Sequence, residues 1–349
     1  MNWLVKTVSR RGMTGGVCLA LCLMANSGWA FSALYSFGDS LSDTGRNPAP
    51  AVSYYNGRYS NGALWVEYLA TQLGLTYNPS NNLAVAGSTT ADLAAEVAQV
   101  SAGPDFSGSL FTIWSGGNDF LDNATLGLND PAWNTVIMSA LQNITNAVNS
   151  LYAKGAREIL VGNLPNIAQI PAANGLPPIY LSYLTSKVVS LNSLLAAGLH
   201  TVQLASPGLQ IYLLDTYTLF NRCYTSPATY GFAVVTTDAL DNAALTDKSF
   251  DGPGKNYLFW DSIHPTTKTH ALIAAAAFQI TGVQLDVRRN ASGMTLLVSN
   301  LNPGSTYTIQ SSTNLANWSN YQILTAASTN ASLVLGNAGS GGVFYRVRY

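Results

Sequence analysis

The chain has 349 residues, which at about 150 residues per domain predicts about two domains, and its 48% hydrophobic content excludes intrinsic disorder. Only 9% of the residues are charged, against about 25% in ordinary soluble chains, a composition that suits a secreted protein. The net charge is −1, and outside the first 30 residues no basic region remains to hold phosphates, which argues against a nucleic-acid partner.

The first 30 residues have the pattern of a cleavable export signal. Lys6, Arg10 and Arg11 precede an apolar run from about Val17 to Met24, and Gly28-Trp29-Ala30 offers small residues to a signal peptidase. We therefore expect a signal peptide over residues 1–30 and a secreted, periplasmic or cell-surface protein. The run is shorter than the ~20 residues of a membrane span, and no transmembrane span is expected elsewhere.

Removal of the signal peptide also determines how many cysteines the mature protein would keep. Cys18 and Cys22 would leave with the signal, so that Cys223 alone remains and no internal disulfide is predicted. A lipid-modified Cys22 is the alternative to cleavage after residue 30, but Leu21 stands where a small residue would be expected.

From Ala33 to about Gly282, short apolar runs alternate with longer helical stretches. The runs predict strands at Leu34–Phe37, Leu83–Ala86, Leu110–Trp114, Ile159–Gly162 and Leu209–Leu214. Apolar residues at helical spacing predict helices at Leu64–Leu73, Trp133–Ala153, Tyr180–Leu204 and Thr266–Ile280. This alternation predicts an α/β domain over residues 31–283, with a parallel sheet whose ligand lies beyond the carboxyl ends of the strands.

After Gly282 the hydropathy pattern changes to short segments in which apolar and polar residues alternate, separated by turn residues. They are Met294–Val298, Thr306–Gln310, Tyr321–Leu324, Ser332–Leu335 and Val343–Val347. The pattern predicts a small all-β sandwich over residues 284–349. Its role could be attachment to a surface or glycan, spacing or substrate targeting, although its aromatic residues favour packing over a glycan cleft.

Three polar segments follow predicted strands. Ser40, after the first strand, is a candidate nucleophile whose backbone N–H could bind an anion, or else a helix N-cap. Gly87 could present its N–H without obstruction, or could simply form a tight turn. Asn118 is a neutral donor able to stabilise an oxyanion, or a loop cap.

A serine nucleophile needs a base, and the chain has three histidines. His200 and His270 lie within helical stretches, where a structural role is expected. His264 lies on a loop, three residues after Asp261, whose carboxylate could orient the ring while the other nitrogen deprotonates Ser40. A surface salt bridge or half a metal site is the alternative, but no further cluster completes a metal shell, so no metal is expected.

Taken in order, these segments resemble the GDSL family of serine esterases and lipases, the SGNH hydrolases. The resemblance implies a three-layer α/β/α flavodoxin-like fold, a catalytic triad of Ser40, Asp261 and His264, and an oxyanion hole of Ser40, Gly87 and Asn118. The segments Tyr55–Gly62, Asn163-Leu164-Pro165 and Tyr230-Gly231-Phe232 further resemble the branch that contains plant-type GDSL lipases.

We therefore expect a secreted serine hydrolase that cleaves a small-molecule or lipid carboxylic ester through an acyl-enzyme, with no cofactor. An acyltransferase or a phospholipase on the same triad is the alternative, followed by a non-catalytic surface or glycan-binding protein. The stretch from Cys223 to Asn256 contains Gly and Pro residues and is predicted to form a mobile rim that selects acyl length.

Overall fold

The computed structural model describes residues 31–101 and 103–290, together with residues 6–7, 20–21, 293–301, 306–314, 316–328, 330–335 and 343–348. Contacts within the chain separate two units. Residues 31–71 and 76–277 form the larger unit, and residues 278–349 belong, with 1–30 and 72–75, to the other. The predicted signal peptide lies outside the described residues except for two short strands paired antiparallel, β1 (Lys6–Thr7) and β2 (Ala20–Leu21).

The larger unit is built on a four-stranded parallel sheet in the order β3-β4-β5-β6. Its strands are β3 (Leu34–Gly38), β4 (Leu110–Trp114), β5 (Glu158–Gly162) and β6 (Gln210–Leu214). The helices are α1 (Trp65–Gln72), α2 (Leu93–Ala98), α3 (Gly117–Asp122), α4 (Asp130–Ala153), α5 (Pro178–Ala205), α6 (Thr216–Thr225) and α7 (Thr267–Thr281). The predicted α/β domain with a parallel sheet is thus confirmed.

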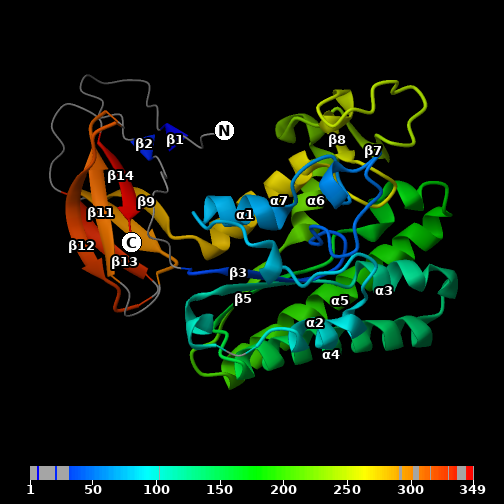
Figure 1. The fold of residues 1–349 in the computed structure, drawn as a ribbon, viewed down its shortest axis with the longest axis horizontal. Helices are drawn as coiled ribbons and strands as arrows, with labels where there is room; N and C mark the ends of the chain where they lie inside the picture. The colour runs from blue at the N-terminus through cyan, green and yellow to red at the C-terminus, as the bar shows by residue number, and fades with distance from the viewer. Residues whose placement is uncertain are drawn as a thin grey trace. The chain divides into compact units, whose positions relative to one another are not determined.

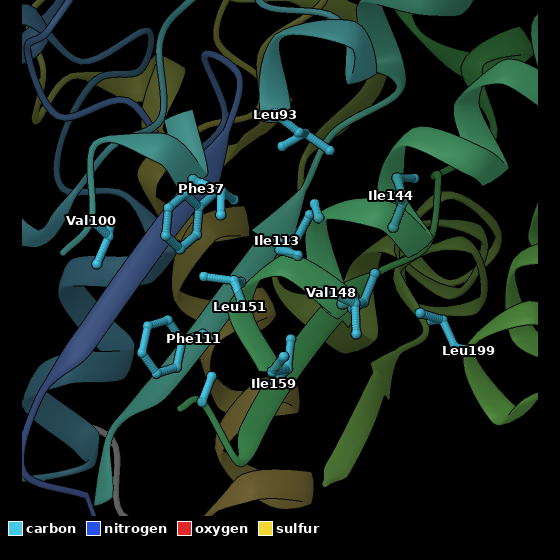
Figure 2. Close-up of a cluster of buried hydrophobic side chains, with 14 of the residues drawn as sticks. Phe37, Leu93, Val100, Phe111, Ile113, Ile144, Val148, Leu151, Ile159 and Leu199 are labelled. Atoms are coloured by element: carbon cyan, nitrogen blue, oxygen red, sulfur yellow. The ribbon is translucent and has the colours of Figure 1, made fainter. Parts of the chain in front are cut away.

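Helices cover both faces of this sheet, as the three-layer prediction requires. Figure 1 shows α2, α4 and α5 on one face and α1, α6 and α7 on the other. The first face is sealed by an apolar cluster in which Phe37, Phe111 and Ile159 of the strands meet Ile144, Val148 and Leu151 of α4 (Figure 2). On the other face, the rings of Trp65 in α1 and Trp114 in β4 meet edge to face, with centroids 5.8 Å apart.

The chain signals where α4 begins and ends. The side chain of Asn129 accepts a hydrogen bond from the N–H of Ala132, and Pro131 occupies the first turn, where its missing N–H costs nothing. Gly155, just beyond the helix, has a φ of +109°, a conformation that most other residues resist. The prediction that a helix begins at Trp133 was therefore three residues late.

The predicted strand at Leu83–Ala86 is present only as an irregular edge. Leu83 and Val85 donate backbone hydrogen bonds to Ser36 and Gly38 of β3, at 2.7 and 2.9 Å. The alternate N–H groups, of Ala84 and Ala86, donate instead to the side chains of Asn82 and Asp43. Because these side chains satisfy the outward donors, the edge is closed to another strand.

Several short elements were not predicted. These are α2, α3, α6 and two strands that pair parallel with each other, β7 (Val234–Asp238) and β8 (Tyr257–Phe259). Apart from α6, which has ten residues, these elements have only three to six residues and show too little periodicity to be recognised. They matter here because β8 leads directly into the segment that contains Asp261 and His264.

The C-terminal residues form antiparallel sheets, as predicted. One sheet has the order β13-β10-β9 and the other β12-β11-β14. The strands are β9 (Gln284–Asn290), β10 (Gly293–Ser299), β11 (Thr306–Ser312), β12 (Ser319–Thr325), β13 (Asn330–Leu335) and β14 (Phe344–Arg348). Leu296, Tyr307 and Ile309 are buried in their common core. The ring of Trp318 lies under the guanidinium of Arg346, and Tyr321 meets Tyr345 edge to face.

One described helix, α5, is long and apolar enough to cross a membrane by length and composition alone. Its buried residues recur at spacings of three and four, at Leu184, Val188, Leu191, Leu195 and Leu199. Leu195 and Leu199 belong to the cluster that covers the sheet. This pattern is that of a helix packed along one side of a domain core.

Candidate active site

Ser40, His264 and Asp261 form one chain of hydrogen bonds. The Nε2 atom of His264 lies 2.8 Å from Oγ of Ser40, and Nδ1 lies 2.7 Å from Oδ2 of Asp261. An ionised carboxylate can only accept, so Nδ1 carries the proton and Nε2 is left to accept from the serine hydroxyl. All three residues are largely buried. The arrangement can remove a proton from Ser40 as its oxygen attacks.

The sheet positions these residues at one edge. Ser40 follows β3 by two residues, while Asn118 follows β4 and Leu164 follows β5. Strands β3, β4 and β5 run parallel, so their carboxyl ends meet at the same edge. His264 reaches this edge from the turn between β8 and α7.

Asp261 is held as a carboxylate by four donors. Its Oδ1 accepts from the backbone N–H groups of Ile263 and His264, at 2.9 and 2.7 Å. Its Oδ2 accepts from His264 and from the hydroxyl of Tyr54, which is 2.7 Å away. Burial alone would raise the pKa of Asp261, but the hydrogen bonds and the nearby histidine lower it below its ordinary value.

The three residues predicted to form an oxyanion hole differ in how the structure places them. Among the described residues, no acceptor is found for the backbone N–H of Ser40 or of Gly87. The side-chain amide of Asn118 donates one hydrogen bond to the carbonyl of Ser88, at 2.8 Å, and retains a second N–H. Ser40 and Asn118 line the same depression, whereas Gly87 does not line it.

Gly87 is tied to the site through its neighbours. Ala86, which precedes it, donates to the Asp43 carboxylate, and Ser88, which follows it, accepts from Asn118. Gly87 itself has a φ of +88°, and a Cβ there would have no heavy atom within 4 Å. The glycine is therefore required by its backbone conformation and not by close packing.

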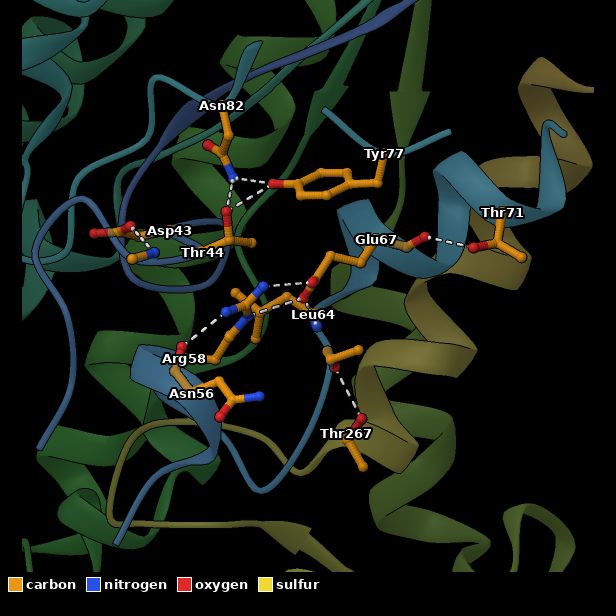
Figure 3. Close-up of polar contacts among 12 residues, drawn as sticks. Asp43, Thr44, Asn56, Arg58, Leu64, Glu67, Thr71, Tyr77, Asn82 and Thr267 are labelled. Carbon is orange, nitrogen blue, oxygen red and sulfur yellow. Dashed lines mark hydrogen bonds and ion pairs between the residues drawn. The ribbon is translucent and has the colours of Figure 1, made fainter. Parts of the chain in front are cut away.

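Acidic residues around the site serve as hydrogen-bond acceptors. Asp43 accepts from the N–H groups of the following turn, at Gly45, Arg46 and Asn47 (Asp43 is labelled in Figure 3). Asp119 accepts from both the N–H and the hydroxyl of Thr90.

The carboxyl group of Asp39 is buried beside the nucleophile. It accepts from the N–H of Leu41, and burial raises its pKa to about 6. Asp39 is therefore protonated more readily than an exposed aspartate as the pH falls toward 6.

An apolar depression opens beside the candidate nucleophile. It encloses about 510 Å³, including the part open to solvent, and Ser40, Asn118 and His264 lie on its wall. Its apolar lining includes Leu41, Trp114, Leu121, Leu164, Ile167 and Ile170. No residue from 223 to 256 lines it, so that stretch does not form the wall of this depression, and its role as a mobile rim over the site stays a prediction. The segment after β5 supplies Leu164, Ile167 and Ile170, and most of the remaining apolar wall comes from the segments after β3 and at and after the end of β4.

The other two histidines lie outside this arrangement. His270 is fully buried in α7, and neither ring nitrogen has a partner among the described residues. Burial lowers the pKa of His270 to about 3, which keeps the ring neutral. His200 lies near the end of α5, as predicted. Among the described residues, no group of three or more His, Cys, Asp or Glu could hold a metal ion.

Two residues with contacts to the site were missed in the sequence. Tyr54 lies just before the recognised segment Tyr55–Gly62, and no spacing relates it to Asp261. Glu96, on α2, accepts from the N–H of Gly38 at 2.8 Å, directly before Asp39. A buried glutamate in a short helix leaves no signal in a single sequence, because its partner lies 58 residues away.

Comparison with known proteins gives a consistent result. Residues 34–277 match the family described as GDSL-like Lipase/Acylhydrolase. The chain is 27% identical over 271 residues to the thermolabile hemolysin of Vibrio parahaemolyticus, covering 68% of this chain but only 61% of the hemolysin. It is 28% identical over 321 residues to the phosphatidylcholine-sterol acyltransferase of Aeromonas hydrophila, covering 72% and 91% of the two chains. A GDSL esterase/lipase of Arabidopsis thaliana is 24% identical over 348 residues, covering 78% and 96%.

Proposed function

Because the chain belongs to the GDSL-like lipase/acylhydrolase family and is therefore a hydrolase of ester bonds, we propose that it cleaves carboxylic esters with Ser40 as the nucleophile. The observation that carries the proposal is the continuous hydrogen-bonded chain from Ser40 through His264 to Asp261. Such a chain needs no cofactor to generate a nucleophile at neutral pH.

The reaction proceeds in two steps through an acyl-enzyme. Oγ of Ser40 attacks the ester carbonyl carbon while Nε2 of His264 takes the hydroxyl proton, and Asp261 stabilises the resulting imidazolium. The same proton passes to the leaving alkoxide, which departs as the alcohol. Water then loses a proton to Nε2 and attacks the acyl carbon, and Ser40 recovers its proton as the carboxylic acid leaves.

Three donors are proposed for the developing oxyanion: the N–H groups of Ser40 and Gly87 and the amide of Asn118. Two observations support this set, namely the unpaired N–H of each backbone group among the described residues and the second amide N–H of Asn118. Donors of this kind each lower the barrier by ~2.7–4 kcal/mol in other serine hydrolases.

The apolar depression supports an acyl group with a hydrocarbon chain. Leu164, Ile167 and Ile170 offer such a chain a surface free of charge, and transfer of each CH₂ from water to such a surface stabilises binding by ~0.8 kcal/mol. The one carboxyl group in the lining, Asp39, would disfavour a carboxylated acyl group.

The test is turnover of p-nitrophenyl acetate, butyrate and palmitate by residues 31–349, beside the Ser40→Ala and His264→Ala variants. We expect turnover by the wild type and a loss of about 10⁴-fold or more in both variants. Turnover that survives Ser40→Ala would show that the nucleophile is misassigned. The order of the three esters measures the preference for chain length.

Acyl transfer to an alcohol other than water is the second candidate. It is favoured by the similarity to a protein named as a phosphatidylcholine-sterol acyltransferase, which the chain covers over 91% of its length. The same acyl-enzyme would then be attacked by the alcohol hydroxyl in place of water. Product analysis with glycerol or a sterol present distinguishes the two, since a transferase forms a new ester and a hydrolase releases only the acid.

Export is proposed from the pattern of the first 30 residues. Cleavage after Ala30 would make Phe31, the first residue of the larger unit, the new N-terminus. N-terminal sequencing of the protein recovered outside the cytoplasm tests this, and a chain that retains residues 1–30 would contradict it.

A further inference from the structure

Asp261 has a fourth hydrogen-bond partner that the two-step reaction does not use. The Tyr54 hydroxyl lies 2.7 Å from Oδ2 of Asp261, and the same oxygen accepts from Nδ1 of His264 at 2.7 Å. Because the other oxygen accepts two backbone N–H groups, each carboxylate oxygen has two donors. Tyr54 and His264 therefore share the negative charge of one oxygen.

We propose that Tyr54 is a positioning residue of the triad, which holds the Asp261 carboxylate in place and moderates how strongly it stabilises a protonated His264. The inference rests on the proposed function, since it assigns Tyr54 a role in the chemistry of Ser40 and His264. Tyr54 acts through Asp261 alone, because it does not line the depression beside Ser40.

The loop that carries Tyr54 is bonded to both sides of the turn that contains Asp261 and His264. The indole N–H of Trp260 donates to the carbonyl of Ser53 at 2.8 Å, so the residues directly before Asp261 and Tyr54 are joined. Beyond the histidine, the hydroxyl of Ser60 donates to the carbonyl of Pro265 at 2.9 Å. These bonds hold the loop and the turn as one unit.

A second set of bonds holds the far end of the loop on α1. The guanidinium of Arg58 lies 2.7 Å from the carboxylate of Glu67, which also accepts from the N–H of Leu64 (Figure 3). Asn61 accepts from the N–H of Thr267 at the start of α7. The loop is therefore attached to α1 and to the start of α7.

Aromatic packing restricts the Tyr54 ring itself. It packs against the buried cluster of Ala239, Tyr257 and Trp260, and its centroid lies 5.5 Å from that of Tyr59. The Tyr59 ring in turn lies 4.9 Å from the His264 ring. A side chain packed in this way needs little reordering to keep its hydroxyl on Asp261.

Burial, and then the hydrogen bond to Asp261, raises the pKa of Tyr54 well above its ordinary value. The hydroxyl consequently stays a donor throughout the neutral range. Other titratable groups interact with these residues through charge: Asp241 and Tyr59 with Tyr54, Asp238 with Asp261, and Asp39 and His270 with His264. Among the tyrosines in the described part of the chain, Tyr54 is the one whose hydroxyl donates a hydrogen bond to Asp261.

The test is Tyr54→Phe, which keeps the ring and removes only the hydroxyl. Loss of this donor leaves more negative charge for the imidazolium, so the His264 ring should take up its proton at a pH higher by about 0.5–1 unit. NMR of histidine-labelled protein measures this directly, with the His264→Ala variant to assign the signal among the three histidines. The midpoint of the acidic limb in the pH profile of kcat/KM should move to higher pH by the same amount. The kcat value should fall about 3- to 10-fold, with KM unchanged.

Tyr55→Phe is the matched control, since this neighbouring tyrosine contacts Phe250 and makes no contact with the triad. It should leave both the NMR titration and the rate profile as in the wild type. An unchanged His264 titration in Tyr54→Phe, or an equal shift in Tyr55→Phe, would overturn the proposal. Because the titration needs no substrate, it decides the role of Tyr54 even if the wild type cleaves none of the esters, a result that would count against the proposed function alone.

Discussion

The Nε2 atom of His264 lies 2.8 Å from the hydroxyl oxygen of Ser40, although 224 positions separate the two residues in the chain. The parallel sheet brings Ser40 to its carboxyl edge, and the turn between β8 and α7 brings His264 to the same place. Asn118 and the apolar depression complete the surroundings of this pair.

Asn118→Ala should lower kcat by about 10²–10³-fold and change KM little, because the amide acts on charge that develops only in the transition state. Steady-state kinetics on a short ester measures this. Asn123→Ala is the control, since Asn123 also donates its amide to a backbone carbonyl, that of Asp119, but lies outside the depression. Equal losses in the two variants would assign Asn118 to structure and not to catalysis.

Leu121→Trp should lower the turnover of palmitate relative to acetate by about tenfold or more, because the indole would occupy space in the depression that a long chain needs. Competition between the two p-nitrophenyl esters gives the ratio. Leu128→Trp introduces the same side chain at an exposed position outside the depression and should leave the ratio unchanged. If both variants keep the wild-type ratio, the acyl chain binds elsewhere.

Glu96→Gln should make the protein less sensitive to alkaline pH. Burial raises the pKa of Glu96 from 4.5 to about 8, so the folded state holds a proton that the unfolded state releases. The stability from this proton is complete below about pH 4.5 and is lost as the pH rises through about 8. The glutamine keeps an acceptor for Gly38 and cannot ionise.

Urea unfolding of both proteins at pH 5 and pH 9 measures the effect. Between the two pH values, the wild type should lose on the order of 4 kcal/mol more stability than the variant. Asp39 and Glu158, whose pKa values burial raises to about 6 and about 7, act in the same direction in both proteins and cancel in the comparison. Parallel pH dependences would show that Glu96 is not the group responsible.

Gly38→Ala should destabilise the fold by at least ~4 kcal/mol, because its Cβ would lie 1.9 Å from the carbonyl oxygen of Trp114 on the neighbouring strand. Gly45→Ala is a close control: its φ of +130° nearly equals the +132° of Gly38, but no heavy atom lies within 4 Å of the added Cβ. Its cost should be only the ~1–2 kcal/mol of the backbone conformation. Thermal unfolding of the two variants separates contact from conformation, and similar losses would contradict the close approach of β3 to β4.

The chemistry of the candidate site could be predicted because it lies in short segments. Asp261 and His264 are three residues apart, so one turn joins them, and Ser40 and Asn118 each follow an apolar run that forms a strand. The long helices α4 and α5 were predictable for a similar reason, since many turns repeat the same apolar spacing. Local geometry and periodicity depend only on residues that are close in the sequence, so they can be predicted without the tertiary structure.

Contacts between distant segments depended on the tertiary structure. The hydroxyl of Tyr54 donates to Asp261 across 207 positions in the chain, and the N–H of Gly38 donates to Glu96 across 58 positions. The wall of the depression comes from the segments around the ends of β3, β4 and β5, and residues 223–256, where Gly and Pro had suggested a rim, do not line it. Each of these contacts follows from the order in which the strands lie side by side and from how the loops pack at their carboxyl ends. Sequence spacing carries no record of either, because long-range packing energies are spread over many side chains and leave no local pattern.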